Sequence, residues 1–261
     1  MTLPRQAATG ADAAPRLRSR ATLVMLALIA ALAFAGFVAL GTWQVERRAW
    51  KLDLIERVDQ RVHAPATAAP GPAQWPQVNA ANDEYRRVQA TGTFLHDRET
   101  LVQASTTLGA GHWVITPLRQ ADGTIVLVNR GFVSPERREP STRSADAPQG
   151  TTTVTGLLRL TEPGGGFLRR NDPAGGRWFS RDVQAIAAAR GLGQVAPYFI
   201  DAQADPPASG SAQRWPVPGL TVISFPNSHL VYALTWYGLA LMVVGAAWYV
   251  GREESRLRRS R

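Results

Sequence analysis

Two long runs of apolar residues stand near the two ends of the chain, and each is long enough to cross a lipid bilayer. Residues 21–40 and 230–250 contain no charged side chain. At about 1.5 Å of rise per residue, a helix of about twenty residues matches the roughly 30 Å hydrocarbon core of a membrane. The pattern therefore predicts two transmembrane helices that flank a central region of residues 41–229.

The charges beside these runs predict how the chain crosses the membrane. Residues 1–20 carry four arginines against one aspartate, a net +3, and residues 251–261 carry five arginines against two glutamates, again +3. Most of the net charge of +9 therefore lies beside the two runs, which favours a topology signal over a nucleic-acid-binding surface. Because positive charge stays on the cytoplasmic side, we expect both termini in the cytoplasm and residues 41–229 outside it.

A cleaved signal peptide is an alternative interpretation of the first run. Ala33-Phe34-Ala35 would supply an A-x-A cleavage site after a basic segment. The run is longer than a typical signal core, however, and a helical apolar pattern continues beyond it to about residue 62. The residues that form this pattern are Trp43, Trp50, Leu54, Val58 and Val62. A membrane span that continues as a helix is therefore the favoured prediction.

The central region has the alternating, β-branched pattern of strands. We expect strands over residues 86–94, 99–103, 112–119, 124–133, 151–160, 194–200 and 220–224, and a loop over residues 64–76. Asp122 and Gly123 mark a hairpin, and Asp182–Arg190 has the cap and composition of a short helix. A sheet of this many antiparallel strands must hide its edges. The predicted fold class is α+β: two transmembrane helices around a β-rich, antiparallel, barrel-like domain with one or two short helices.

No sequence motif of an enzyme is present. The chain contains no G-x-S-x-G, H-E-x-x-H or P-loop pattern. It has no cysteine, which excludes disulfides, thiolate metal sites and a cysteine nucleophile. Its four histidines are far apart, and no two have metal-ligand spacing. We expect a protein that is not an enzyme and keep an unrecognised hydrolase only as the least favoured alternative.

His229 is the residue with the clearest candidate chemistry, because it stands one residue before the second apolar run. An imidazole at a membrane edge can ligate the iron of an amphipathic haem. Tyr232 and Trp236 follow it on the same helical face. The alternative is an interfacial polar residue with no special role, and His229 considered by itself favours that alternative.

Two other places stand out against their surroundings. Asn129 and Arg130 interrupt the most apolar predicted strand, where an unpaired polar side chain is costly. They are either an anchor for a propionate or partner, or a structural feature, namely a buried ion pair or a bulge at Gly131. The residues by themselves favour the structural interpretation. Lys51 is the only lysine among 29 basic residues, which suggests a need for a compact ammonium group.

Three segments together form a longer pattern. Residues 40–51 read L-G-T-W-Q-V-E-R-R-A-W-K, residues 126–133 read V-L-V-N-R-G-F-V, and residues 226–237 read P-N-S-H-L-V-Y-A-L-T-W-Y. These segments resemble the signatures of the surfeit-locus (Surf/Shy) family of cytochrome c oxidase assembly proteins, with Phe132 where that family has tryptophan. Besides the residues of the last block, the matching positions are Gly41, Trp43, Gln44, Arg47, Trp50, Lys51, Asn129, Arg130, Gly131 and Asn227.

The resemblance implies an assembly factor for haem–copper cytochrome c oxidase that binds haem a and assists its delivery to the catalytic subunit. It implies that His229 is the iron ligand and that Trp236 and Tyr232 line the cofactor site. The implied partners are the oxidase catalytic subunit, membrane lipid and, as a further candidate, haem a synthase, but no nucleic acid. An alternative is a membrane scaffold that stabilises an oxidase assembly intermediate without binding haem. The oligomeric state stays open.

The resemblance also bears on where the protein resides. Mitochondrial members carry a targeting extension, whereas a short basic tail precedes the first span here, so we expect a bacterial inner-membrane protein. The expected organisation is a cytoplasmic tail (1–20), a first span (21–40), a periplasmic domain (41–229), a second span (230–250) and a cytoplasmic tail (251–261).

Overall fold

The computed structural model describes residues 17–166, 168–204, 214–221, 223, 225 and 227–260, except the side chains of residues 144 and 146. The chain divides into two compact units. The first combines Met1–Asp53 with Phe225–Arg261, and the second is Leu54–Ser224.

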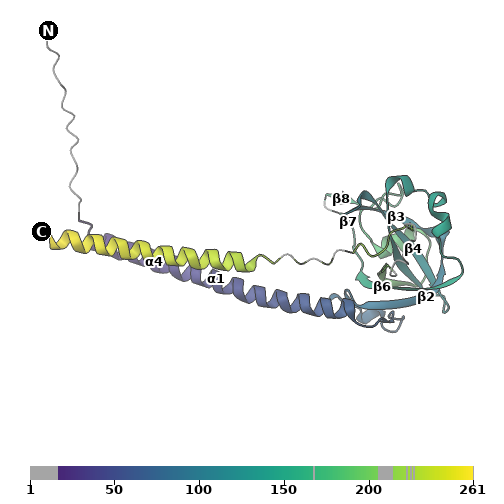
Figure 1. Ribbon diagram of the computed structural model, residues 1–261, viewed down its shortest axis with the longest axis horizontal. Helices are drawn as coiled ribbons and strands as arrows, with labels where there is room; N and C mark the ends of the chain where they lie inside the picture. Colours follow the sequence, from purple (N-terminus) through teal and green to yellow (C-terminus); the bar gives the residue numbers. More distant parts are fainter. Residues whose placement is uncertain are drawn as a thin grey trace, which may run out of the picture. The chain divides into compact units, whose positions relative to one another are not determined.

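The first unit is a pair of long helices, α1 (Arg20–His63) and α4 (His229–Arg259). Both helices are long and apolar enough to cross a membrane, in agreement with the two predicted spans. They lie side by side and antiparallel (Figure 1). Helix α1 continues without a break beyond residue 40, as the apolar pattern predicted. Its last ten residues belong to the second unit, where Val58 is buried.

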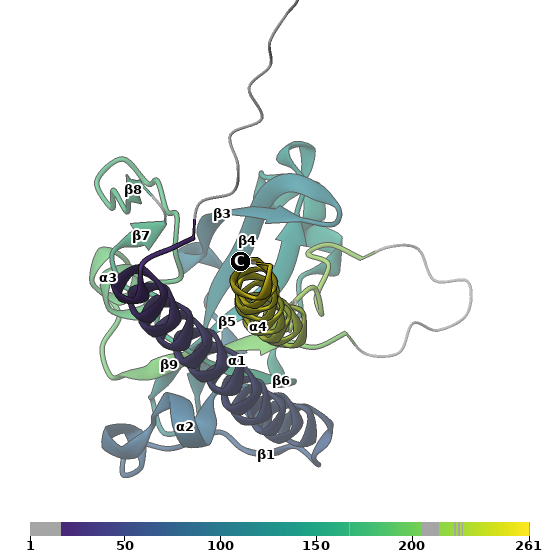
Figure 2. The same ribbon diagram turned by 90° about the vertical axis from the view of Figure 1, so that its left-hand side faces the viewer.

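The second unit contains a closed barrel of five strands. Its main strands are β2 (Arg87–Phe94), β3 (Thr100–Thr106), β4 (Gly109–Gln120), β5 (Ile125–Val133), β6 (Thr151–Leu160) and β9 (Val195–Ala202). The sheet order is β1-β2-β6-β9-β5-β4-β3, and β2 also pairs with β4, which closes β2, β6, β9, β5 and β4 into a ring. Figure 2 labels four of these strands, β4, β5, β6 and β9. Closure removes the edges of these five strands, as the predicted barrel-like domain required.

Smaller elements complete this unit. They are β1 (Thr67–Ala68), η1 (Trp75–Gln77), α2 (Ala80–Asp83), η2 (His96–Arg98), η3 (Pro135–Arg137), η4 (Pro140–Asp146), β7 (Gly165–Gly166), β8 (Arg169–Arg170) and α3 (Val183–Ala189). The Asp182 side chain caps α3 by accepting a hydrogen bond from the Ala185 amide, as the sequence predicted. The predicted hairpin between β4 and β5 is also confirmed, and Gly123 provides its positive φ of 84°.

Three sequence predictions about the sheet need correction. The sheet is not wholly antiparallel, because β5 pairs in parallel with β9 and β1 in parallel with β2. The predicted strand over residues 220–224 is absent at 220, 221 and 223, while 222 and 224 lie outside the described residues. Both edges of the preceding strand β9 are already paired, with β5 and β6. The predicted loop of residues 64–76 includes β1 and the start of η1.

Two apolar clusters stabilise the barrel from inside and outside. The inner cluster joins residues of β2, β4, β5, β6 and β9, including Val128 and Tyr198. The outer cluster packs Ile186 of α3 against Leu127 and Phe199. Because β5 is covered on both faces, all nine of its residues are buried, as is typical of a strand with a parallel neighbour.

Candidate functional site

The structure brings His229 into contact with a second residue of the family-like segments. The Nδ1 atom of His229, the first residue of α4, lies 2.7 Å from the amide oxygen of Gln44 on α1. Because that oxygen can only accept a hydrogen bond, His229 donates from Nδ1 and carries its proton there. Among the described residues, the His229 ring has no second hydrogen-bond partner. In the neutral imidazole this contact selects the tautomer with the proton on Nδ1, in which Nε2 carries the lone pair.

A tightly packed seam between α1 and α4 holds this pair in place. A Cβ atom on Gly41 would come within 2.8 Å of the Tyr237 ring, so glycine is what lets the two helices approach there. The hydroxyls of Thr42 and Tyr237 are 3.1 Å apart. Phe37 stacks on Trp236 with ring centroids 5.8 Å apart. We call this contact between the helices the seam. It is made by Phe37, Gly41, Thr42 and Gln44 of α1 and by His229, Trp236 and Tyr237 of α4.

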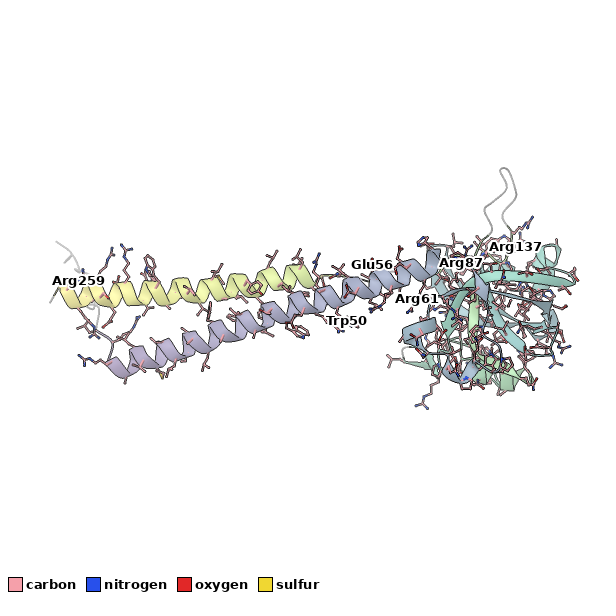
Figure 3. All side chains as sticks on the ribbon, turned by 90° about the horizontal axis from the view of Figure 1, so that it is seen from below. Trp50, Glu56, Arg61, Arg87, Arg137 and Arg259 are labelled. Carbon is pink, nitrogen blue, oxygen red and sulfur yellow. The ribbon has the colours of Figure 1, made fainter. Side chains whose placement is uncertain are left out.

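The seam includes some of the predicted site residues and omits others. Trp236 is in it, but Tyr232 is 53% exposed on the surface of α4. Trp43 and Trp50 are likewise exposed, and Trp50 projects outward from α1 in Figure 3. The Arg47 guanidinium lies 4.1 Å from the centre of the Trp50 ring, a cation–π contact. The helical apolar face predicted from Trp43 to Val62 is therefore not buried throughout.

Two other residues of the family-like segments, Lys51 and Asn227, also belong to the first unit. Lys51 is half-buried on α1. Asn227 precedes α4, and its side-chain oxygen is buried with no hydrogen-bond partner in the described part of the chain.

The Asn129-Arg130-Gly131 segment has a structural role in the barrel. Asn129 donates a hydrogen bond of 2.8 Å to the buried carboxylate of Asp201 and accepts one from the Gly131 amide. Gly131 has a φ of 131°, and a Cβ there would lie 2.3 Å from the Val217 carbonyl oxygen. Only glycine fits this backbone without strain. The register of β4 against β5 shifts between Trp113 and Ile115, opposite this segment, which fits the bulge at Gly131 that the sequence offered.

Arg130 points to the other side of β5 and is also paired. Its guanidinium is 4.0 Å from the Glu99 carboxylate and 5.3 Å from the centre of the Phe94 ring. The same carboxylate receives two hydrogen bonds from Arg143, one of them 2.9 Å long. The side chains of all three charged residues are at least 90% buried. Arg130 is thus part of an internal ion network, in line with the buried ion pair that the sequence offered.

Asp201 is the centre of a second ion network that the sequence did not reveal. It is 2% exposed and accepts hydrogen bonds from Asn129, Arg159, Arg181 and Thr221. These residues come from strands, loops and the end of β9, so no spacing along the chain predicts their contact.

Arg181 links this network to Glu162, which it also bonds. Burial alone would raise the pKa of Glu162, but the hydrogen bonds and charge of Arg181 outweigh burial and hold the pKa below its ordinary value of 4.5.

The described residues contain no cluster of three or more acidic, histidine or cysteine side chains suited to a bare metal ion. A single histidine with a fixed tautomer suits a haem better, because the porphyrin itself supplies four nitrogen ligands and the protein need add only an axial one. The donor chemistry at His229 therefore fits a haem iron.

The family model of the SURF1 family matches residues 31–241, which include the seam and the Asn129-Arg130-Gly131 segment. This chain belongs to the SURF1 family. It is 36% identical over 235 residues to the Surfeit locus protein 1 of Homo sapiens, which covers 83% of this chain and 73% of the human protein. A SURF1-like protein of Monosiga brevicollis is 36% identical over 222 residues, covering 80% of each chain.

In this SURF1-family chain, sequence reasoning named Gln44 only as a matching position and missed the roles of Phe37, Thr42 and Tyr237. Phe37 and Tyr237 lie within apolar, aromatic-rich runs where any face could be turned toward lipid. The small residue Gly41 was the available signal, because small residues mark close helix contacts in membranes.

Proposed function

We propose that this SURF1-family protein assists the assembly of cytochrome c oxidase by binding haem a through His229 and passing it to the catalytic subunit. The observation that carries the proposal is the hydrogen bond from His229 Nδ1 to Gln44. Family membership supports a role in oxidase assembly, and this contact supports the choice of ligand. The proposed role in assembly includes no enzymatic reaction.

The hydrogen bond prepares the imidazole for iron in the way that metal-binding histidines usually are prepared. A ligating histidine commonly donates its second ring N–H to an oxygen, which fixes the ring and increases its basicity. Gln44 supplies that oxygen here. When bound, the haem iron would take the lone pair of Nε2 as an axial ligand.

The rest of the pair of helices suits an amphipathic cargo. Trp236 lies in the seam two helical turns after His229, about 10 Å along the axis of α4, and offers an aromatic wall. Lys51 follows Gln44 by two helical turns on the same face of α1, about 10 Å along the axis. An ammonium there is a candidate partner for a propionate. The apolar farnesyl tail of haem a would stay in lipid beside α4.

The helices also define the proposed location. The backbone amide of Arg18 is 3.4 Å from the Glu254 carboxylate, so the two basic ends lie at the same end of the pair. The positive-inside rule supports a cytoplasmic location for this end and, with it, the proposal of a periplasmic central domain in a bacterial inner membrane. Near this end an apolar groove of about 610 Å³ between the helices suits a lipid chain.

The test is an optical spectrum of the detergent-purified protein, co-expressed with haem a synthesis. We expect haem a in the wild type and loss of its spectrum in His229→Ala. In Gln44→Leu, which removes the acceptor, we expect a shifted spectrum and about tenfold weaker binding, as for other outer-shell partners of metal ligands. His63→Ala is the matched control, because His63 is exposed on α1 and should leave the spectrum unchanged.

The alternative function is a scaffold that holds an oxidase assembly intermediate and never binds haem. Wild-type protein without haem, isolated together with oxidase subunits, would establish that function and end the haem proposal. A spectrum that survives His229→Ala unchanged would leave haem binding in place but remove His229 as its ligand.

A further inference from the structure

A cavity of about 200 Å³ opens on the barrel unit. It lies between the paired strands β3 and β4 and the chain that runs along the outer edge of β3. On the strands it is lined by Leu101, Gln103 and His112. The remaining lining comes from Arg138 and residues 176–179, where Trp178 is 3% exposed and forms a wall.

His112, one of the residues that line this cavity, carries an unsatisfied polar atom. Its Nδ1 atom is buried and has no hydrogen-bond partner in the parts of the chain that the structure describes. A buried polar group without a partner costs about 1–3 kcal/mol. A ligand oxygen that bonds to Nδ1 would recover that cost, so the cavity is suited to a hydrogen-bonding group.

The charges around the cavity indicate the sign of that group. Arg138 and Arg177 line it, and Arg169 lies beside it, bonded to Gln103 at 2.7 Å and stacked on Phe179 at 5.5 Å. Against these three arginines, the acidic partner found nearby is Asp172, which pairs with Arg177. The cavity therefore carries an excess of positive charge next to an aromatic wall.

We propose that this cavity binds a carboxylate carried on an apolar or aromatic group. Arg138 and Arg177 attract the carboxylate, His112 Nδ1 donates to one of its oxygens, and Trp178 and Phe179 pack against the apolar part. Such a group occurs in two natural forms, a tetrapyrrole propionate and an acidic side chain of a partner polypeptide. The proposal does not depend on haem binding at His229.

Proton uptake should accompany this binding. Burial, and then the charge of Arg138, lower the pKa of His112 below its ordinary value of 6.5 in the free protein. A bound carboxylate favours the imidazolium form, as would Asp172, while Arg138, Arg169 and Arg177 oppose it. Binding should therefore strengthen as the pH falls from about 8 to about 6.

The first experiment uses the full-length protein in detergent and sodium benzoate as the probe, with benzamide as a neutral molecule of the same shape. Calorimetry in two buffers of different ionisation enthalpy measures affinity and proton uptake, and imidazole NMR follows His112. We expect saturable benzoate binding with proton uptake, and no binding of benzamide.

Variants assign the binding to this cavity. Arg138→Gln should weaken benzoate binding about twofold to fivefold, the range for an exposed ion pair. His112→Gln keeps a hydrogen-bonding side chain and should abolish the proton uptake. Arg119→Gln is the control, because Arg119 is exposed on the same strand but does not line the cavity.

Equal binding of benzoate and benzamide, or benzoate binding that no cavity variant alters, would overturn the proposal. Competition experiments then distinguish the two natural sources of the carboxylate, the tetrapyrrole and the polypeptide. Displacement by a porphyrin with free propionates, but not by its dimethyl ester, assigns the tetrapyrrole, and displacement by a glutamate-containing peptide assigns a polypeptide. Displacement by neither would show that the cavity has no natural carboxylate ligand of these kinds.

Discussion

The barrel and the pair of helices use their polar residues in opposite ways. In the barrel, Asn129 and Arg130 are buried and bound into ion networks around Asp201 and Glu99. In the pair of helices, the side-chain hydrogen bond of His229 that the described residues show is the one to Gln44. In the barrel, these polar side chains are bonded to other residues of the fold. The arrangement at His229 leaves a nitrogen lone pair available for a ligand.

This difference separates two reasons why a residue can belong to a family signature. Asn129 and Gly131 are explained by the fold, because one bonds a buried carboxylate and the other occupies backbone that a Cβ would not fit. His229 is not explained by the fold in this way. Variants should therefore affect stability in the barrel and ligand binding in the pair of helices.

The largest effect is expected from Asp201→Asn. The variant keeps the size of the side chain but removes the charge that Arg159 and Arg181 share in the interior. We expect a loss of about 3 kcal/mol of unfolding free energy, at the lower end for a broken buried ion pair, because Glu84 and Glu162 remain as partners. Denaturant unfolding in detergent, followed by near-UV circular dichroism, measures it.

The control for this variant is Asp172→Asn, in which the lost partner Arg177 is mostly exposed. That change should cost no more than about 1 kcal/mol. Equal losses in the two variants would contradict the view that the Asp201 network stabilises the barrel.

A smaller effect is expected from Gly41→Ala, which acts on the seam instead. The new methyl group would meet the Tyr237 ring at 2.8 Å, so the helices must separate locally at a cost of about 1–3 kcal/mol. Because the chain has no cysteine, spin labels attached at Leu32→Cys and Leu241→Cys can report the distance between the helices. We expect a longer and broader distance distribution and unchanged unfolding of the barrel.

Gly36→Ala is the matched control on the same helix, because a Cβ at Gly36 meets nothing within 4 Å. If both alanine variants leave the label distance unchanged, the close contact at Gly41 does not hold the seam.

The smallest effect concerns acid pH. The pKa of Glu162 lies below its ordinary value of 4.5 when folded, since Arg181 outweighs burial. The folded barrel therefore binds this proton less tightly than the unfolded chain, and the stabilisation is complete above about pH 4.5 and declines below it. For a side chain 36% exposed we expect only a few tenths of a kcal/mol.

The free energy of unfolding of the wild type and of Glu162→Gln, measured from about pH 3.5 to about pH 6.5, tests this contribution of Glu162. The wild type should lose its advantage over the variant as the pH falls, so parallel stability curves would contradict the assignment.

Much of the architecture could be predicted from the sequence. The spans, the continued helix to residue 63, the hairpin at Gly123 and the cap at Asp182 follow from local patterns. Closure was expected because free strand edges are costly. The parallel pairing of β5 with β9 could not be predicted, because it depends on strands that are more than sixty residues apart in the chain.

The candidate site also has features that local sequence predicts and features that only the folded chain shows. The sequence by itself determined that His229 borders an apolar run and that Asn129 needs a buried partner, because hydropathy and the cost of burying polar groups are properties of each residue in its local segment. Only the tertiary structure decided that Gln44 bonds His229 and that Asp201 bonds Asn129. A hydrogen bond depends on two atoms within about 3 Å, and such closeness between distant segments exists only after the chain has folded.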